Sequence, residues 1–361
     1  MISKDIKWTK GTIHRFAGTG AAGYSGDGEK ADIAQLNGPA GLAVDKNDNV
    51  FVAEMHNHVI RKVDVGTGMI TTVAGCGAKG FDGDGGLAVD AKLNGPAGVF
   101  IDSNENIFIA DFLNHRIRKI DAMTGIINTI AGTGDTGYNG DNIKACDAKL
   151  NYPAGVIADS IGNVYFNDYK NNRIRKISTN GMISTYAGTG TYGYSGDGEL
   201  AEQAQMNDVY GLAIDRYDNI YIIDSLNFAV RKVDAKTGRI TTIVGKGEAG
   251  PVNEFGSITN SFLGGILPNK EKIGVDEVPH AIEVDLNGNL FIADTGSNRI
   301  RMVDIEQGVI YSIAGNGEKA YSGDDGAALN AGLGVYGLRM DSKNNLYFID
   351  FHKHVIRVIR F

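Results

Sequence analysis

The chain is poor in cysteine and in basic residues, and it has no long hydrophobic run. Cys76 and Cys146 are the only cysteines among 361 residues, so two free thiols are the default and a single disulfide between them is the alternative. The formal net charge is −8, so the basic patch that nucleic-acid binding requires is not expected. No apolar run approaches the length of a membrane span. We therefore expect a soluble protein with no nucleic-acid partner and no membrane partner.

The two cysteines do not fix the cellular compartment. The first residues, MISKDIKWTKG, are polar and do not resemble a signal peptide. This favours a cytoplasmic protein, and a secreted protein whose leader has been removed is the alternative.

Glycine is abundant, and its 50 residues fall at recurring positions. Residues 39–75 contain four short apolar runs separated by Asn, Asp and Gly, which predicts a four-stranded antiparallel meander. The segment that opens this stretch, Pro39-Ala40-Gly41, recurs in related form at residues 96, 153, 209, 279 and 335. Six copies at a nearly constant period predict an all-β, six-bladed β-propeller that forms one domain over residues 1–361.

The two ends of the chain carry complementary parts of one blade. Residues 11–18 match the fourth strand of a blade, whereas residues 354–361 match a third strand and then stop. We predict that the N-terminal strand joins the last blade and closes the ring, which removes an exposed sheet edge. Between the fourth and fifth blades, residues 246–278 form a long insertion. We predict a lid there, with a neutral insertion as the alternative.

Two charged features recur in the repeat. Asp27, Asp84, Asp141 and Asp197 follow a glycine in each inter-blade loop, and we predict that they cap a short helical turn. Calcium is the alternative use of these carboxylates, although each loop offers too few oxygens for the usual ligand shell. Arg-Lys pairs recur on the third strands, for example Arg118-Lys119, and we predict that these pairs mark a solvated outer strand.

The repeat unit resembles a known family. The stretches PAGVFIDSNENIFIADFLNHRIRKID (96–121) and PHAIEVDLNGNLFIADTGSNRIRMVD (279–304) are similar to the NHL repeat, and the resemblance extends over nearly the whole chain from residue 11. Proteins with this repeat include peptide-amidating lyases, streptogramin-type lyases, RNA-binding regulators and interaction scaffolds. The resemblance therefore implies the fold and leaves the function open.

One position of the repeat differs between the two halves of the ring. The second residue of the opening segment is, in chain order, Ala40, Ala97, Ala154, Tyr210, His280 and Tyr336. Three residues further on, Glu283 and Arg339 replace the apolar residues of the other blades. A ring that is only structural has no reason for this asymmetry, so we predict a pocket at the channel mouth beside blades 4 to 6. Glu283 and Arg339 form either a mutual ion pair, or a substrate clamp or acid/base pair.

The candidate catalytic residues follow from this comparison. In the amidating lyases, the histidine of the Pro-His segment binds zinc, and His280 would be its equivalent. Here Tyr210 and Tyr336 stand at the neighbouring positions, so we predict metal-free proton transfer with His280 as general acid or base. Tyr210 and Tyr336 would position or protonate the substrate, Arg339 would hold an anionic group, and Glu283 would tune the histidine or the arginine.

The prediction from sequence is a small-molecule enzyme of lyase, cyclase or hydrolase type that requires no cofactor. The alternative is a non-catalytic propeller that binds a protein or peptide, which would show an exposed apolar patch and no deep cavity. Further candidate binding residues are Asp208, Tyr152, Tyr169, Phe262, His352 and His56. Zinc is a secondary expectation, with His280, His352, His56 and His115 as its candidate ligands.

Overall fold

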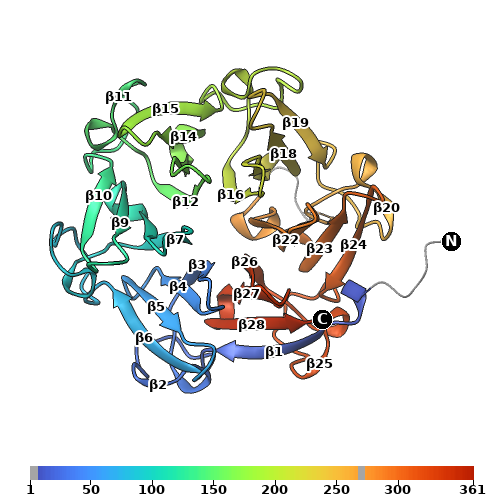
Figure 1. Ribbon diagram of the computed structural model, residues 1–361. Helices are drawn as coiled ribbons and strands as arrows, with labels where there is room; N and C mark the ends of the chain where they lie inside the picture. Colours follow the sequence, from blue (N-terminus) through green and yellow to red (C-terminus); the bar gives the residue numbers. More distant parts are fainter. Residues whose placement is uncertain (1–6, 267–272) are drawn as a thin grey trace.

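The chain folds into a closed ring of six antiparallel sheets around a central channel (Figure 1). The computed structural model describes residues 7–266 and 273–361. Each sheet is one blade with four main strands, which confirms the predicted six-bladed propeller. Within the described residues there is no α-helix, and no helix is long or apolar enough to span a bilayer. Cys76 and Cys146 are exposed and unpaired, as expected.

In each blade the four strands lie side by side, in order from the first strand at the channel to the fourth at the outer edge. The first strands are β3 (Pro39–Val44), β7 (Pro96–Ile101), β12 (Pro153–Ala158), β16 (Val209–Ile214), β21 (Ala281–Val284) and β26 (Val335–Met340). The second strands are β4 (Val50–Glu54), β8 (Ile107–Asp111), β13 (Val164–Asp168), β17 (Ile220–Asp224), β22 (Leu290–Asp294) and β27 (Leu346–Asp350). The third strands are β5 (Val59–Val63), β9 (Arg116–Ile120), β14 (Arg173–Ile177), β18 (Ala229–Val233), β23 (Arg299–Asp304) and β28 (Val355–Arg360). The fourth strands are β6 (Met69–Ala74), β10 (Ile127–Ala131), β15 (Met182–Ala187), β19 (Ile240–Val244), β24 (Val309–Ala314) and β1 (Thr12–Ala17).

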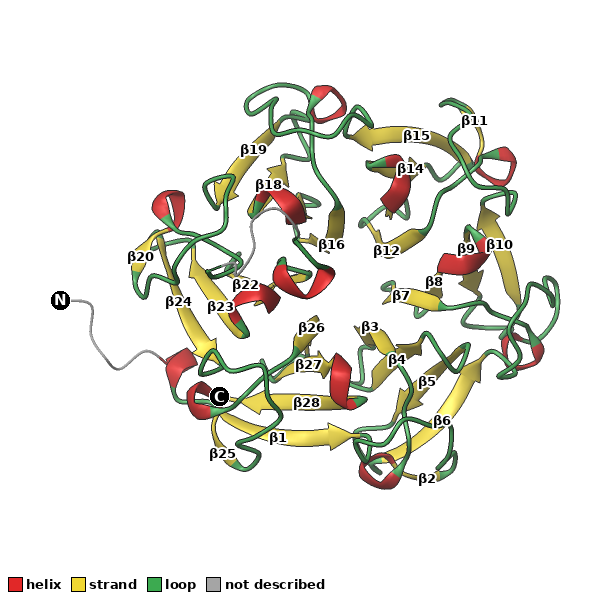
Figure 2. Cartoon of the chain, turned by 180° about the vertical axis from the view of Figure 1, so that it is seen from behind, coloured by secondary structure: helices red, strands yellow, loops and turns green. Residues whose placement is uncertain are grey.

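Short elements complete the outer edge and the turns (Figure 2). Two-residue strands extend four of the blades: β2 (Glu29–Lys30), β11 (Ile143–Lys144), β20 (Gly256–Ser257) and β25 (Gly326–Ala327). Single 3₁₀ turns follow five of the second strands: η4 (Phe112–Asn114), η6 (Tyr169–Asn171), η8 (Ser225–Asn227), η11 (Thr295–Ser297) and η13 (Phe351–Lys353). Six more lie in the inter-blade loops: η2 (Ala31–Ile33), η3 (Ala88–Asp90), η5 (Ala145–Asp147), η7 (Ala201–Gln203), η9 (Ile258–Asn260) and η12 (Ala328–Asn330). The remaining two are η1 (Lys7–Thr9) and η10 (Val275–Glu277).

The N-terminal strand closes the ring. β1 pairs antiparallel with β28, so that Ile13 lies opposite Ile359. The first and last parts of the chain thus share one blade, in which the blue β1 runs beside the red β28 in Figure 1. This confirms the closure that the sequence predicts.

The hydrophobic core lies between neighbouring blades. One cluster, for example, joins Leu42 and Val52 of the first blade to Ile349 and Ile356 of the last. The second strands carry continuous apolar runs because they are buried on both faces. The first strands approach closely at the third position of the opening segment, where a Cβ on Gly41 would lie 2.5 Å from the carbonyl oxygen of Ala97. Glycine is required there.

The arginines of the Arg-Lys pairs are buried, so the predicted solvated strand is wrong. Six arginines of the third strands are completely inaccessible to solvent: Arg61, Arg118, Arg175, Arg231, Arg301 and Arg357. Each guanidinium contacts the carboxylate that ends the second strand. Five of the six also pair with the aspartate of the inter-blade loop. Alternation along the strand leaves the following lysine on the other face, where Lys119 lies over the ring of Phe108.

The loop aspartates are therefore not helix caps, which corrects the prediction. The 3₁₀ turns begin four residues after each aspartate and have no side-chain cap. Asp84 instead lies 2.7 Å from Arg118 Nη2. A buried charge is costly unless it is paired, so the aspartate and the arginine recur together.

Replacement of one buried arginine should destabilise the ring strongly. We expect Arg118→Leu to lower the free energy of unfolding by about 3–5 kcal/mol, because Asp111 would be left buried without its cation. Lys119→Leu, on the adjacent half-exposed residue, is the matched control and should change it by less than about 1 kcal/mol. Urea unfolding of both variants tests this, and equal losses would contradict it.

The long loop between blades 4 and 5 is mostly an ordinary inter-blade loop. Ala249 pairs with Leu263 in the same parallel bridge that joins Ala22 to Leu36 in the first loop. Glu254 takes the place of the loop aspartate and binds the backbone nitrogen and hydroxyl of Ser312, at 2.7 and 2.6 Å. The additional residues are 265–277, and the part of the predicted lid at 267–272 lies outside the described residues.

Candidate functional site

A cavity of about 570 Å³ opens at one mouth of the channel. Its wall is made by the beginnings of the first strands and by the turns that follow the second strands. Most of the lining residues are apolar. The polar side chains that line it are those of Tyr169, Tyr210, Asp276, His280, Tyr336, Arg339 and His352.

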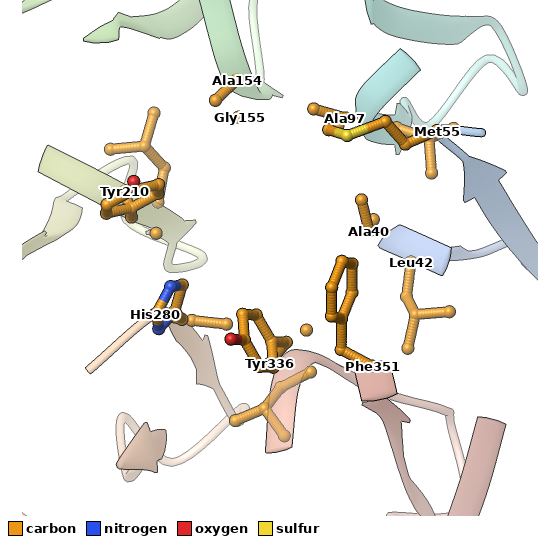
Figure 3. A pocket seen from close by; sticks show the side chains of 18 of the residues that line it. Ala40, Leu42, Met55, Ala97, Ala154, Gly155, Tyr210, His280, Tyr336 and Phe351 are labelled. Atoms are coloured by element: carbon orange, nitrogen blue, oxygen red, sulfur yellow. The ribbon is translucent and has the colours of Figure 1, made fainter. Parts of the chain in front are cut away.

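The two halves of the cavity wall differ in the size of their side chains (Figure 3). Ala40, Ala97 and Ala154 stand on one side of the opening, and Tyr210, His280 and Tyr336 stand on the other. The rings on the second side form a continuous series, in which the His280 ring lies 5.0 Å from that of Tyr210 and 4.5 Å from that of Tyr336. The small alanine side chains leave the cavity open on their side, and the rings of Tyr210, His280 and Tyr336 form its opposite wall.

The opening segments that carry Tyr210, His280 and Tyr336, the aromatic half of the wall, are each held by a buried side chain of the blade before them. Asn167 donates to the carbonyl oxygens of Val209 and Tyr210, at 2.9 and 2.8 Å. Ser225 donates to the carbonyl oxygen of Pro279 at 3.0 Å. Thr295 does the same for Val335 at 2.6 Å. The backbone at Tyr210, His280 and Tyr336 is thus fixed before any ligand binds. Ser225 and Thr295 directly follow the second strand of their blades. The equivalent residues of the other four blades are large and line the cavity: Met55, Phe112, Tyr169 and Phe351.

His280 is a neutral imidazole at the centre of the ring series. Its Nδ1 lies 2.9 Å from the carbonyl oxygen of Val278, which only accepts, so Nδ1 carries the proton and Nε2 keeps a lone pair. Burial lowers the pKa of His280 to about 4. Nε2 has no hydrogen-bond partner among the described residues. At neutral pH this atom can accept a proton or a hydrogen bond from a bound molecule.

Tyr210 begins a hydrogen-bond chain that leads away from the cavity. Its hydroxyl donates to the hydroxyl of Tyr169 at 2.7 Å, and Tyr169 donates to Asp208 Oδ2 at 3.1 Å. Burial raises the pKa of Tyr210 to about 12, and burial also raises the pKa of Asp208. The chain brings together three residues that the sequence analysis singled out.

Asp276 places a carboxylate at the rim of the cavity. Its Oδ2 lies 2.7 Å from Lys319 Nζ and 3.2 Å from His352 Nε2. Partial burial opposes ionisation, but the hydrogen bond and charge of Lys319 hold the pKa of Asp276 below its usual range. Asp276 was missed by the sequence analysis because it lies in the extra segment, which has no counterpart in the repeat.

Glu283 and Arg339 form an ion pair at the floor of the cavity. Arg339 Nη1 lies 2.8 Å from Glu283 Oε2, and Arg339 Nε donates to the carbonyl oxygen of Leu42 at 3.1 Å. Glu283 does not line the mouth cavity. It lines a second chamber of about 180 Å³ deeper in the channel, and Arg339 borders both spaces. Of the two alternatives from sequence, the geometry favours the ion pair.

Several predicted binding residues lie outside the cavity lining. Phe262 packs under Lys246, whose Nζ lies 4.9 Å from the ring centre. His56 contacts Asn37 at 3.4 Å. Tyr152 packs against Phe112 and His115. Of the candidate binding residues, Tyr169 and His352 line the cavity, and Asp208 reaches it through Tyr169.

Three histidines of the repeat have a structural role. His58, His115 and His354 each accept a hydrogen bond at Nδ1 from a backbone N–H of the next blade, at 3.1 Å in every case. Within residues 7–266 and 273–361, no group of three or more His, Cys, Asp or Glu side chains is arranged to hold a metal ion. Zinc and calcium binding stay predictions.

Comparison with known proteins identifies the repeat. Residues 19–81 and 133–195 match the family described as the teneurin NHL domain. Over 331 residues the chain is 26% identical to NHL repeat-containing protein 2 of Bos taurus, in an alignment that covers 83% of this chain and 43% of that protein. The chain is an NHL-repeat β-propeller. It is also 28% identical over 308 residues to the chloroplastic protein SUPPRESSOR OF QUENCHING 1 of Arabidopsis thaliana, covering 82% of this chain and 27% of the plant protein. The NHL-repeat chain thus spans less than half the length of these relatives.

Solved structures share the fold at low sequence identity. A protein of unknown function from Bacteroides thetaiotaomicron has a TM-score of 0.69 at 16% identity, covering 97% of this chain and 75% of that one. Virginiamycin B lyase from Staphylococcus aureus has a TM-score of 0.55 at 15% identity, covering 98% and 100%. A gluconolactonase from Xanthomonas campestris has a TM-score of 0.55 at 11% identity, covering 90% and 86%. At such identity the likeness shows the fold alone, and enzymes are among the propellers that share it.

Proposed function

We propose that this NHL-repeat propeller is a small-molecule enzyme that performs acid–base chemistry of lyase, cyclase or hydrolase type in the mouth cavity. The observation that carries the proposal is the neutral His280, which stands between Tyr210 and Tyr336 at the wall of a 570 Å³ cavity. Ligand sites are commonly concave and mostly apolar, with a few polar groups that converge on the ligand. The cavity has these features.

The roles of the residues follow from their hydrogen bonds. His280 Nε2 takes a proton from the substrate, because Nδ1–H is held by the carbonyl oxygen of Val278. Tyr336 has no hydrogen-bond partner for its hydroxyl among the described residues, so that hydroxyl serves as the donor to the substrate. Arg339 is already bound to Glu283 and to Leu42, and an anionic substrate group would compete with those contacts. We therefore assign Arg339 and Glu283 to the cavity floor.

The substrate class follows from the lining. An apolar wall interrupted by a few hydrogen-bonding groups suits a largely apolar or aromatic molecule with one or two polar atoms. The alternative function, a protein- or peptide-binding scaffold, predicts an apolar surface patch without a deep cavity. The volume of the mouth cavity, about 570 Å³, supports the first proposal over this alternative.

A thermal-shift screen of small apolar and aromatic compounds tests the proposal. A ligand at one hundred times its dissociation constant stabilises the folded state by about 2.7 kcal/mol, which raises the melting temperature by about a few degrees. Ala97→Trp places a large ring in the small half of the cavity and should abolish the shift. Met123→Trp, at a position 96% exposed, is the matched control and should keep it. Hits that bind both variants equally would contradict the proposal.

A further inference from the structure

A proton path leads from the mouth cavity to a carboxylate outside it. Three side chains form the path, from Tyr210 at the cavity wall through Tyr169 to Asp208. We propose that Asp208 is the proton reservoir of the cavity and exchanges protons with a bound substrate through Tyr169 and Tyr210. This inference rests on the proposed acid–base function and extends it to a residue that does not touch the cavity.

The direction of the hydrogen bonds is fixed at one end. An ionised carboxylate only accepts, so the hydroxyl of Tyr169 donates to Asp208 Oδ2 at 3.1 Å. The hydroxyl of Tyr210 then donates to that of Tyr169 at 2.7 Å. Since both hydroxyl protons are directed toward Asp208, the oxygen of Tyr210 has its lone pairs available on the cavity side.

The repeat itself does not require an acid at position 208. The equivalent positions of the first two blades are Gly38 and Gly95, and both have a positive φ. Asp208 has a φ of 61°, a conformation that costs a residue with a side chain on the order of 1 kcal/mol. Backbone geometry therefore favours glycine, and the carboxylate is present at some cost to stability. The hydrogen-bond partner of the Asp208 carboxylate is the hydroxyl of Tyr169, which is bonded in turn to Tyr210 at the cavity wall.

Among residues 7–266 and 273–361, Lys170 supplies the charge that pairs with Asp208. Lys170 Nζ lies 4.0 Å from Asp208 Oδ1 and also lies over the Tyr169 ring, 4.1 Å from its centre. On the other side of Tyr210 stands His280, with ring centres 5.0 Å apart. Asp208 is mostly buried, with 16% of its side chain exposed, and burial raises its pKa despite Lys170 and Tyr169. The carboxylate is thus easier to protonate than an ordinary aspartate.

The proton transfer balances without any further reactant. A substrate proton other than the one that His280 takes passes to the oxygen of Tyr210, while the hydroxyl proton of Tyr210 passes to Tyr169 and that of Tyr169 passes to Asp208. The O–H bond on Asp208 forms as the bond to hydrogen on the substrate breaks, and no electron is gained or lost by the protein. The reverse sequence returns the proton. The protons move together along the path, because the raised pKa of Tyr210, about 12, disfavours a free tyrosinate as an intermediate. Asp208 and Tyr169 act through Tyr210 and are positioning residues.

An NMR titration of the whole chain tests the path without any substrate. Protein labelled with ¹³C at the tyrosine Cζ is titrated with acid, and Tyr169→Phe and Tyr210→Phe assign the two signals. We expect both signals to shift together at one midpoint above the usual aspartate range, which reports Asp208. In Asp208→Asn this shared inflection should vanish. Asp135→Asn, at an exposed carboxylate, is the control and should retain it.

Tyr169→Phe supplies the decisive comparison because it keeps Asp208 and removes only the linking hydroxyl. The signal of Tyr210 should then no longer follow Asp208. A Tyr210 signal that follows Asp208 unchanged in Tyr169→Phe, or an inflection that persists in Asp208→Asn, would overturn the inference. Neither result depends on turnover, so a failed relay is distinguishable from a failed proposed function, which the cavity-filling variant tests.

Discussion

Deletion of residues 1–17 should remove most of the stability of the propeller. β1 supplies the fourth strand of the last blade, and without it β28 would become an open edge. The completely buried Ile13 and Ala17 would be lost from the core. Trp8, whose ring lies 5.0 Å from that of Phe291 and 4.7 Å from that of Phe361, would also be lost. We expect a loss of more than about 5 kcal/mol, comparable to the whole stability of many domains. Thermal unfolding measures it.

A pair of point variants within β1 is the control for this deletion. Ile13→Ala should cost about 2–4 kcal/mol, because the residue is buried. Arg15→Ala, at an exposed position of the same strand, should change the free energy of unfolding by less than about 0.5 kcal/mol. If the deletion melts at the temperature of the full chain, or if the two point variants are equivalent, β1 does not close the ring.

His280→Gln should lower turnover of an identified substrate by about 10²- to 10⁴-fold and leave its affinity within a few-fold. Glutamine fills similar space but cannot take a proton. In the unaltered chain His280 has a pKa of about 4, so activity that depends on its neutral form should persist down to that pH. The folded pKa lies below the unfolded value of about 6.5. The neutral imidazole therefore contributes stability that is present above about pH 6.5 and is lost as the pH falls toward 4.

His56→Gln is the matched control for this variant. His56 lies in the turn after a second strand but does not line the cavity. Its replacement should leave turnover, affinity and the pH profile unchanged. Full activity in His280→Gln, or an acid limb near pH 6.5 in the unaltered chain, would show that His280 is not the base.

The architecture could be predicted from the sequence because the same signal is repeated six times. A turn or an apolar run at one place is ambiguous, but its recurrence at a step of 56 or 57 residues, with a single longer step of 70 before the fifth blade, strongly favours a propeller. The repeat also supplied a reference for each position. Against Ala40, Ala97 and Ala154, the residues Tyr210 and His280 stood out, and the structure places both in the cavity wall.

The failed predictions concern contacts between segments that are distant in sequence. Arg118 was expected to face solvent because nothing in its own strand reveals that Asp84, 34 residues earlier, covers it. Glu254 escaped notice as a loop carboxylate because its neighbours are not glycines. Glu283 is close to His280 in sequence and yet lines the deeper chamber, since a step of three residues along β21 leads down the channel. Side-chain partners of this kind are set by the closed ring.

The central claim is that the mouth cavity binds a small molecule against the aromatic half of its wall. A crystal structure of the protein soaked with the strongest compound from the thermal-shift screen tests this most directly. We predict density for the compound between Tyr210, His280 and Tyr336, with a polar atom of the compound within hydrogen-bond distance of His280 Nε2. Density on the outer edge of the blades, or in the chamber beside Glu283, with the mouth cavity empty, would contradict it.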